Sequence, residues 1–213
     1  MANVVKWSKV LVDVQSALGS AVTISSISVA PVGVVTYSGT DPANGDYALL
    51  TVEGMHQVNG RVFKVASVNT TANTFEIEAT TGYDAFTSGS FQLITFGTSM
   101  QTATGLTASG GEFDFLDVTT IHENVRKQVP GAASAASYTF ESLWDPADAG
   151  LVAMKAASDA QAQRCVRFTF SAGQKVVFNG YVGATLLPTG NAQDIVKTAV
   201  TVTMFGRPTI YSS

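Results

Sequence analysis

The chain has 213 residues, of which 46% are hydrophobic and only 13% charged, and its formal net charge at pH 7 is −4. The apolar content argues against a disordered chain. The 12 basic residues form no basic block, which argues against a protein that binds free nucleic acid. No apolar run approaches the roughly 20 residues that span a bilayer, and no signal peptide is evident. So few surface charges do little to keep copies apart, and we expect a component of an assembly.

Alternation of apolar and polar residues with period two predicts a mainly β protein. Most segments alternate in this way, and the clearest expected strands are residues 9–14, 61–68, 74–79, 113–119, 137–143, 164–171, 175–182 and 195–205. Turn signals separate these strands. The Ala172-Gly173-Gln174 turn predicts a tight hairpin between the strands at 164–171 and 175–182.

One helix is expected after residue 144. Asp145 can cap its start, Pro146 suits the first helical position, and Asp148 lies in the first turn, where the helix dipole favours an anion. The helix should end near Ser158. Gly150 inside it costs about 1 kcal/mol relative to alanine, so tertiary packing must hold this helix.

The charges divide unevenly along the chain. Residues 21–96 hold six acidic and two basic residues, whereas the rest of the chain holds ten of each. The segment is also strand-like throughout and is flanked by the small residues Ser20 and Gly97. We therefore expect a small domain, residues 21–96, inserted into a larger β-sandwich formed by residues 1–20 and 97–213.

Catalytic, cofactor-binding and metal sites are not expected. His56 and His122 each stand alone, without the paired spacing of a metal site. Cys165, the single cysteine, has no evident histidine partner and reads as a buried space-filler. The pair Glu76 and Glu78 could model a glycosidase couple, but alternation explains it better as the wet face of a strand. The sequence therefore predicts that the protein is not an enzyme.

A polar segment links the strands at 113–119 and 137–143, and small residues continue it to Ala136. Its polar residues include His122, Glu123, Arg126, Lys127 and Gln128. Hairpin loops usually have two to five residues, so a loop of about fifteen indicates a function. Its mixed charges favour a contact arm over a passive linker.

The C-terminal half carries three short motifs in a fixed order. The strand at 175–182 contains Phe178-Asn179-Gly180-Tyr181-Val182, the strand at 195–205 contains Val200-Thr201-Val202-Thr203, and Gly206-Arg207-Pro208 follows. In order and spacing they resemble the F-x-G-[WY]-V, V-T-V-T and G-[RK]-P motifs of the major tail tube proteins of long non-contractile tailed phages. The resemblance covers residues 1–20 and 97–213. It implies a β-sandwich of the tail tube fold with one flanking α-helix.

The segment at 21–96 resembles a different module. Its turns Asn44-Gly45-Asp46 and Asn59-Gly60-Arg61 and its strand at 74–77 follow a small β-barrel that recurs in phage tail proteins. The module is named after a domain of ubiquitin-activating enzymes, but no nucleotide loop or paired catalytic cysteine is present. Many such modules carry His-Gly before the first turn, whereas this chain has Thr40-Asp41-Pro42. Contacts that depend on that histidine are therefore not transferred.

The first resemblance implies a structural virion protein, located in the virion tail and assembled in the host cytoplasm. Such subunits form homo-hexameric rings, which stack into the tube that delivers the genome. The implied partners are other copies of the chain and the tail tip, tape-measure and tail terminator proteins. Genomic DNA would pass through without tight binding, and neither a cofactor nor a membrane is involved.

This assignment gives two sets of residues a role. The contact loop with His122, Glu123, Arg126, Lys127 and Gln128 is expected between stacked rings. The lumen is expected to be lined by Thr201 and Thr203, or by Thr139 and Glu141, depending on which sheet faces it. The alternative is a receptor- or glycan-binding virion protein, an adhesin or minor tail protein, with the small barrel as its binding module. Assembly state separates the two, because a tube subunit forms rings or filaments alone whereas adhesins usually form trimers.

Overall fold

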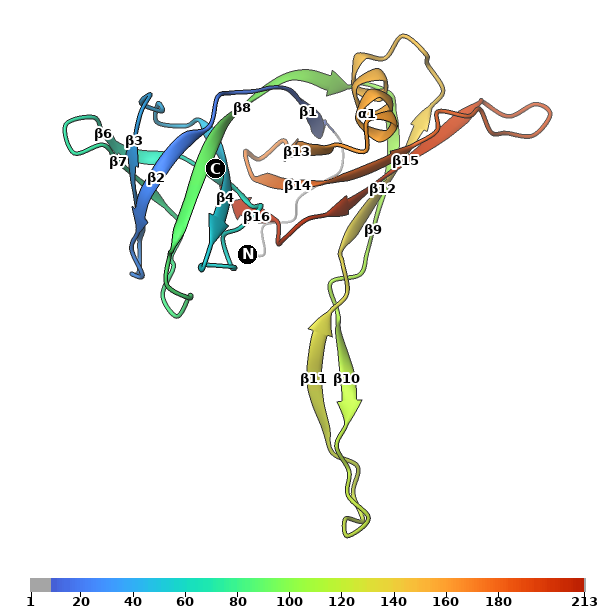
Figure 1. Cartoon of the computed structure of the whole chain (residues 1–213). Helices are drawn as coiled ribbons and strands as arrows, with labels where there is room; N and C mark the ends of the chain where they lie inside the picture. The colour runs from blue at the N-terminus through green and yellow to red at the C-terminus, as the bar shows by residue number, and fades with distance from the viewer. Residues whose placement is uncertain (1–8, 213) are drawn as a thin grey trace.

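The computed structural model describes residues 9–212, so residues 1–8 and 213 of the expected sandwich lie outside the described residues. Within that range the protein is mainly β with one helix (Figure 1). The elements are β1 (Leu11–Leu18), β2 (Val22–Ile27), β3 (Gly33–Ser38), β4 (Tyr47–Glu53), β5 (Val62–Lys64), β6 (Ala66–Asn69), β7 (Thr74–Ile77), β8 (Ser88–Met100), β9 (Ala103–Ser109), β10 (Phe113–Asp117), β11 (Gln128–Ala133), β12 (Ser137–Leu143), α1 (Ala149–Asp159), β13 (Gln163–Thr169), β14 (Lys175–Ala184), β15 (Lys197–Met204) and β16 (Thr209–Tyr211).

The strands build one 14-stranded sheet and one separate hairpin. The main path of the sheet is β6-β7-β3-β2-β8-β1-β13-β14-β15-β12-β9, with β4 and β5 joined to β8 and with β16 joined to β14. All of its pairings are antiparallel, and within residues 9–212 β10 pairs with β11 alone. The expected mainly β, sandwich-like fold with one helix is confirmed.

β8 connects the two halves of the molecule. Its first half pairs with β2 and β4, and its second half, from Ile94 to Met100, pairs with β1. A bulge between Val14 and Gln15 bends the β1–β8 pair. The strand passes residues 96 and 97, where the expected insert and sandwich meet, without a break. The two halves therefore share one continuous strand.

The sandwich core lies where the sheet curls over itself. Phe140 of β12 contacts Phe168 of β13 with ring centroids 5.8 Å apart, although these strands are not neighbours in the sheet. Tyr138 meets the Phe178 ring at 5.1 Å. The helix α1 closes the core with its buried residues Leu151, Met154 and Ala157.

A second core lies inside residues 22–91. It is centred on Phe75, Phe91 and Tyr37, which pack edge-to-face or tilted with centroids 5.2–5.8 Å apart. We call the strands around it, β2 to β7 with the first half of β8, the module. A third cluster joins the two cores, and in it Cys165 and Val177 of the sandwich pack against Tyr47 and Val62 of the module.

The helix begins three residues later than expected. Asp148, rather than Asp145, is its N-cap, and Pro146 precedes the helix. The Asp148 carboxylate accepts the Leu151 N–H at 3.0 Å and also the Gln101 N–H at 2.9 Å. This second bond comes from a residue far away in the sequence. The local cap signals at 145 and 146 could not reveal it.

The expected loop of about fifteen residues is in fact the second half of a long hairpin. β11 occupies Gln128–Ala133 and pairs with β10. This hairpin projects far from the body of the molecule (Figure 1). Sequence analysis did not predict β11, because its Val-Pro-Gly sequence and small residues lack the alternation that is typical of strands.

Other predicted strands hold with shifted ends. The strand expected at 61–68 divides into β5 and β6, and the expected ranges did not include β2, β3, β4, β8, β9, β11 or β16. The hairpin between β13 and β14 is confirmed. There Phe170 N–H donates to the Gln174 carbonyl at 2.9 Å, and Gly173 takes the left-handed conformation with φ 93°. In the described range, no helix has the length and apolar character to cross a membrane.

Candidate functional site

One outer face of the sandwich is built mainly from hydroxyl-bearing and small residues. It belongs to β14, β15, β12 and β9, which lie side by side in that order. Two rows cross it, and the pairing register aligns their members strand to strand. The rows are Tyr181–Thr203–Ser137–Ser109 and Gly183–Thr201–Thr139–Thr107. We call this surface the hydroxyl face.

The hydroxyl face brings together both sets of predicted lumen residues. Thr139 lies opposite Thr201, and their hydroxyl oxygens are 3.2 Å apart. Thr203 lies in the adjacent row on one side of this pair. Glu141 lies in the adjacent row on the other side, opposite Ala199. Thr139 and Thr201 are half-buried, and Thr203 and Glu141 are exposed. The two alternatives of the sequence analysis are therefore one surface.

The charge on this face is low. A third row, next to the Thr139–Thr201 row, holds the carboxylate of Glu141 between Ala199 and Gly105. The nearest cation along β15 is Lys197, which lies opposite Leu143 at the start of the strand. The central rows thus offer hydroxyl groups and no ammonium or guanidinium group.

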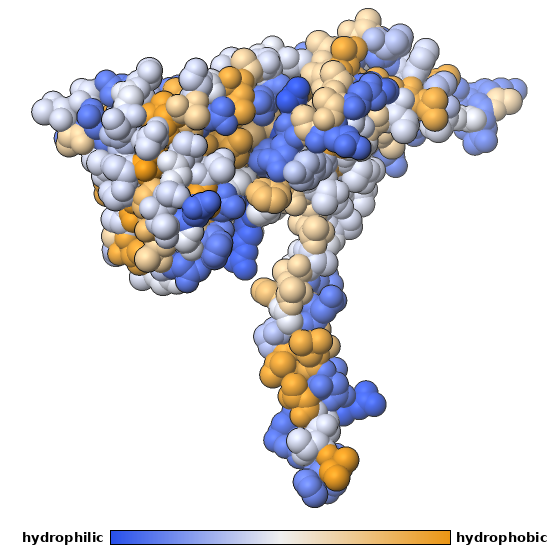
Figure 2. Space-filling view, in the orientation of Figure 1, coloured by the Kyte–Doolittle hydropathy of each residue, from blue (hydrophilic) through white to orange (hydrophobic). Residues whose placement is uncertain are grey.

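The projecting hairpin exposes apolar side chains on both of its faces. Phe115 pairs with Pro130, and the next pair, Leu116 with Val129, points to the opposite side. Phe115 is 63% exposed and Leu116 59%. Figure 2 shows that hydrophobic residues gather along the shaft of the hairpin. A two-stranded hairpin is at best marginally stable in water, so these faces call for a partner surface.

The tip of the hairpin holds the predicted contact residues. Glu123 forms an ion pair with Lys127, and its other oxygen accepts the Thr120 N–H at 3.3 Å. His122 and Arg126 are exposed there. Gln128 lies lower, in β11 opposite Asp117. The sequence analysis identified the polar tip but missed the apolar shaft, because the alternation in 113–119 predicts a strand whose Phe side chains are buried.

Two glycines turn the chain from the sheet into the hairpin. Gly110 and Gly111 have φ values of 76° and 84°. A Cβ atom on Gly110 would lie 2.2 Å from the Ala135 carbonyl oxygen on the returning strand. Glycine is therefore required at position 110, and the two strands approach closely at the root of the hairpin.

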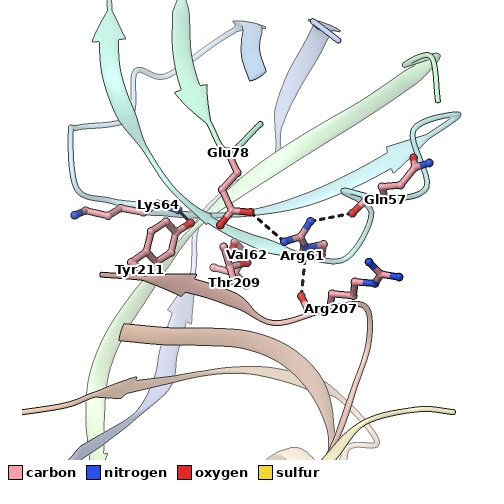
Figure 3. A network of polar contacts seen from close by, with 8 residues as sticks. All are labelled: Gln57, Arg61, Val62, Lys64, Glu78, Arg207, Thr209 and Tyr211. Carbon is pink, nitrogen blue, oxygen red and sulfur yellow. Dashed lines mark hydrogen bonds and ion pairs between the residues drawn. The ribbon is translucent and has the colours of Figure 1, made fainter. Parts of the chain in front are cut away.

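A buried arginine ties the module to the C-terminal segment (Figure 3). The Arg61 guanidinium pairs with the Glu78 carboxylate at 3.2 Å and donates to the carbonyl oxygens of Gln57 and Arg207, both at 3.2 Å. It also lies over the Phe63 ring, 4.8 Å from the centroid. All three polar contacts end on acceptors, as a buried cation requires.

Glu78 is half-buried, whereas the sequence analysis expected a solvent-facing residue. Burial raises the pKa of its carboxyl, and the neighbouring Arg61 opposes this without cancelling it. Phe75 and Ile77 do face the module core as predicted. The strand β7 ends at Ile77, so alternation does not place the residue after it.

The last strand, β16, continues this tie. Thr209 Oγ1 donates to the Val62 carbonyl at 2.6 Å, and the Tyr211 hydroxyl accepts the Lys64 N–H at 2.7 Å (Figure 3). Gly206, with φ 87°, turns the chain from β15 toward these contacts. The Gly206-Arg207-Pro208 motif therefore directs the end of the chain against the module.

The residues considered for catalysis remain apart. His56 and His122 are both exposed, one in the module and the other at the hairpin tip. Cys165 is fully buried, and this burial raises the pKa of its thiol to about 12, so it stays protonated. Across residues 9–212, no three histidine, cysteine or carboxylate side chains gather in a way that could hold a metal ion.

Comparison with known proteins agrees with a structural role. No curated protein matches the chain significantly. The family described as "Phage tail tube protein, TTP" matches residues 53–213, which is more than half of the chain. The match includes the second part of the module, the projecting hairpin, the hydroxyl face and the C-terminal motif. The chain therefore belongs to the phage tail tube protein family and is a structural component of the virion tail.

Proposed function

We propose that this protein forms homo-hexameric rings that stack into the tube of a long non-contractile phage tail, through which the genome leaves the virion. In this proposal the tail tip, tape-measure and tail terminator proteins are its further partners, and assembly takes place in the host cytoplasm. The observation that carries the proposal is the hydroxyl face, because a DNA conduit needs a wall of this chemistry.

The argument for the wall is electrostatic. Duplex DNA carries about one negative charge per 1.7 Å of its length, and a protein that neutralises several phosphates holds it with steep salt dependence. Such binding would stop a passing genome. The rows of Thr107–Thr139–Thr201 and Ser109–Ser137–Thr203 present neutral hydroxyls, and Glu141 repels phosphate. We therefore assign the hydroxyl face to the lumen.

Ring formation is supported by the edge of the same surface. β9 ends the sheet path, so among residues 9–212 one side of its backbone has no neighbouring strand. Unpaired edges invite pairing with another chain. In a ring, the edge of one subunit would meet the next subunit, and the lumenal sheets would become continuous.

Stacking is supported by the hairpin. Its apolar shaft is exposed on both faces, and its tip carries Arg126 and the Glu123–Lys127 ion pair. Head-to-tail contacts of this kind produce open filaments. We assign the hairpin to the contact between one ring and the next.

We also propose that residues 21–96 are an inserted small barrel on the outside of the tube. The Gly19 N–H donates to the Leu93 carbonyl at 2.8 Å, so the chain enters and leaves the module at adjacent points. The module has its own aromatic core. Its net charge of −4 suits a solvated exterior.

Negative-stain electron microscopy of the concentrated, purified protein tests the proposal. We expect rings and hollow tubes, with rings of six subunits in class averages. A protein that stays monomeric under all salt and concentration conditions would contradict it. Stable trimers that bind a glycan would favour the adhesin alternative instead.

A further inference from the structure

The turn between β2 and β3 exposes aliphatic side chains that the module core does not use. Val29 is 50% exposed and Val32 46%, with Pro31 between them on the surface. Ile27 and Val35, at either side of the turn, are the residues that enter the core. The exposed valines are therefore free to contact another molecule.

A buried threonine holds this turn in one conformation. Thr80, 1% exposed, donates from its hydroxyl to the Ser28 carbonyl at 2.6 Å and accepts the Ala30 N–H at 3.1 Å. Its own N–H donates to the Ala30 carbonyl at 2.9 Å. The Ser28 hydroxyl accepts the Val34 N–H at 2.8 Å. Such a turn loses little entropy on binding, which favours a recognition surface.

The turn lies on the side of the molecule toward which the hairpin projects. In Figure 1 the connection between β2 and β3 and the shaft of β10 and β11 point the same way. No charged residue occurs from 27 to 40, so the segment that forms this turn is itself uncharged. A subunit that stacks through its hairpin brings this tip toward the adjoining ring at a fixed spacing.

We propose that the turn from Val29 to Val32 is a second stacking contact, which docks on a copy of this chain in the adjoining ring. The inference rests on the proposed function and adds a role for the module, which then joins rings as well as covering the tube. Two valines and a proline bury little area alone. The contact is repeated by every subunit of a ring, and such multivalency makes a weak contact effective.

Thiol labelling tests this contact directly. The single native cysteine, Cys165, is buried, so a cysteine introduced on the surface is the reactive thiol of the chain. Val29→Cys places a thiol on the turn. Thr71→Cys is the control, on the exposed connection between β6 and β7 at another edge of the module (Figure 1). Both changes are small and lie outside the cores.

In free subunits, a maleimide should label both variants at similar rates. In assembled tubes, we expect labelling at position 29 to slow at least tenfold and labelling at position 71 to stay unchanged. Tubes in which position 29 reacts as fast as in free subunits overturn the inference while the proposed function stands. A wild-type protein that forms no tubes overturns both.

A second variant measures the consequence of the contact. Val29→Asp with Val32→Asp should leave rings intact and shorten the tubes, because a buried carboxylate on each subunit opposes stacking. Thr71→Asp should form tubes of normal length. Normal tubes from the double variant would also overturn the inference, whatever the labelling result.

Discussion

Gly150 of the helix lies directly against the backbone of Met100. A Cβ atom at position 150 would stand 2.6 Å from the Met100 Cα and 2.7 Å from its nitrogen. Both Met100 atoms belong to the backbone of β8, so they cannot move aside as a side chain would. The glycine therefore permits the close approach of α1 to the strand that joins the two halves of the molecule.

Gly150→Ala should destabilise the protein, although alanine favours a helix by about 1 kcal/mol. Overpacking a tight core costs about 1–3 kcal/mol. Because the added Cβ atom would clash with backbone atoms, we expect this cost to exceed the gain in helix propensity. We expect the free energy of unfolding, measured by urea denaturation, to fall by about 1–2 kcal/mol. Ala156→Gly at an exposed position of the same helix is the matched control and should cost about 1 kcal/mol. A stabilised Gly150→Ala variant would show that the helix can move away from β8.

The contribution of Glu78 to folding stability should change with pH in the opposite direction to that of a carboxylate in an ordinary surface ion pair. Burial raises the pKa of Glu78 above its usual 4.5, so the folded protein holds this proton more tightly than the unfolded chain does. Stability contributed by this group is therefore greatest at or below pH 4.5 and declines as the pH rises through the raised pKa.

Glu78→Gln removes this titration and keeps an oxygen that can accept from Arg61. We expect the stability of the wild type relative to the variant to decrease as the pH rises from 4.5 to 7, measured by urea denaturation at each pH. Glu53→Gln, at an exposed strand end in the module, is the control. A wild-type advantage that grows with pH would mean that Arg61 outweighs burial.

The hairpin should be required for tubes and dispensable for folding. Phe115→Ser with Leu116→Ser removes the most exposed apolar groups from both faces of the shaft, so we expect rings without tubes. The thermal unfolding temperature should stay within a few degrees, because these side chains contribute little to the core. Tubes of normal length from this variant would remove the shaft from the stacking contact.

The tip needs a separate test, because Lys127 already has a partner in Glu123. Reversing Lys127 alone would place two carboxylates side by side within the hairpin. Arg126→Glu therefore tests the contact with the next ring, while Arg126→Lys keeps the positive charge and serves as its control. We expect Arg126→Glu to shorten the tubes, seen by electron microscopy. Normal tube length in this variant would show that Arg126 carries no inter-ring contact.

Period-two alternation predicted the strands that have one solvent-facing and one buried side, such as β12 and β15. It failed where a strand does not have one buried and one solvent-facing side. Most side chains of β8 are half-buried, and β11 is exposed along most of its length, so neither strand shows a clear alternation. The helix was predicted in the right region, but its cap depends on Gln101 and Thr102, which only the fold brings to Asp148.

The same limit applies to the candidate site. Sequence alternation grouped Thr201 with Thr203 and Thr139 with Glu141, but the pairing of β12 with β15 was needed to unite them. The exposure of the aliphatic residues in the turn between β2 and β3 could not be predicted from the sequence either. Val29 and Val32 look like core residues until the structure shows that Ile27 and Val35 fill the core.

The hydroxyl face offers the sharpest test of the lumen. Thr201→Lys places a cation in the middle of this face, beside Thr139 and Gly183. If the face lines the channel, each subunit of a ring adds one ammonium group to the channel wall. Tubes of the variant should then retain a short DNA duplex that wild-type tubes release. Counterion release makes such binding weaken steeply with salt, so the affinity should fall at least tenfold between 50 and 200 mM salt, as roughly expected for several phosphate contacts. Thr71→Lys on the module adds the same charge elsewhere, and Thr201→Val removes the hydroxyl without a charge. Equal DNA retention by the Thr201→Lys and Thr71→Lys tubes would place the lumen on another surface of the subunit.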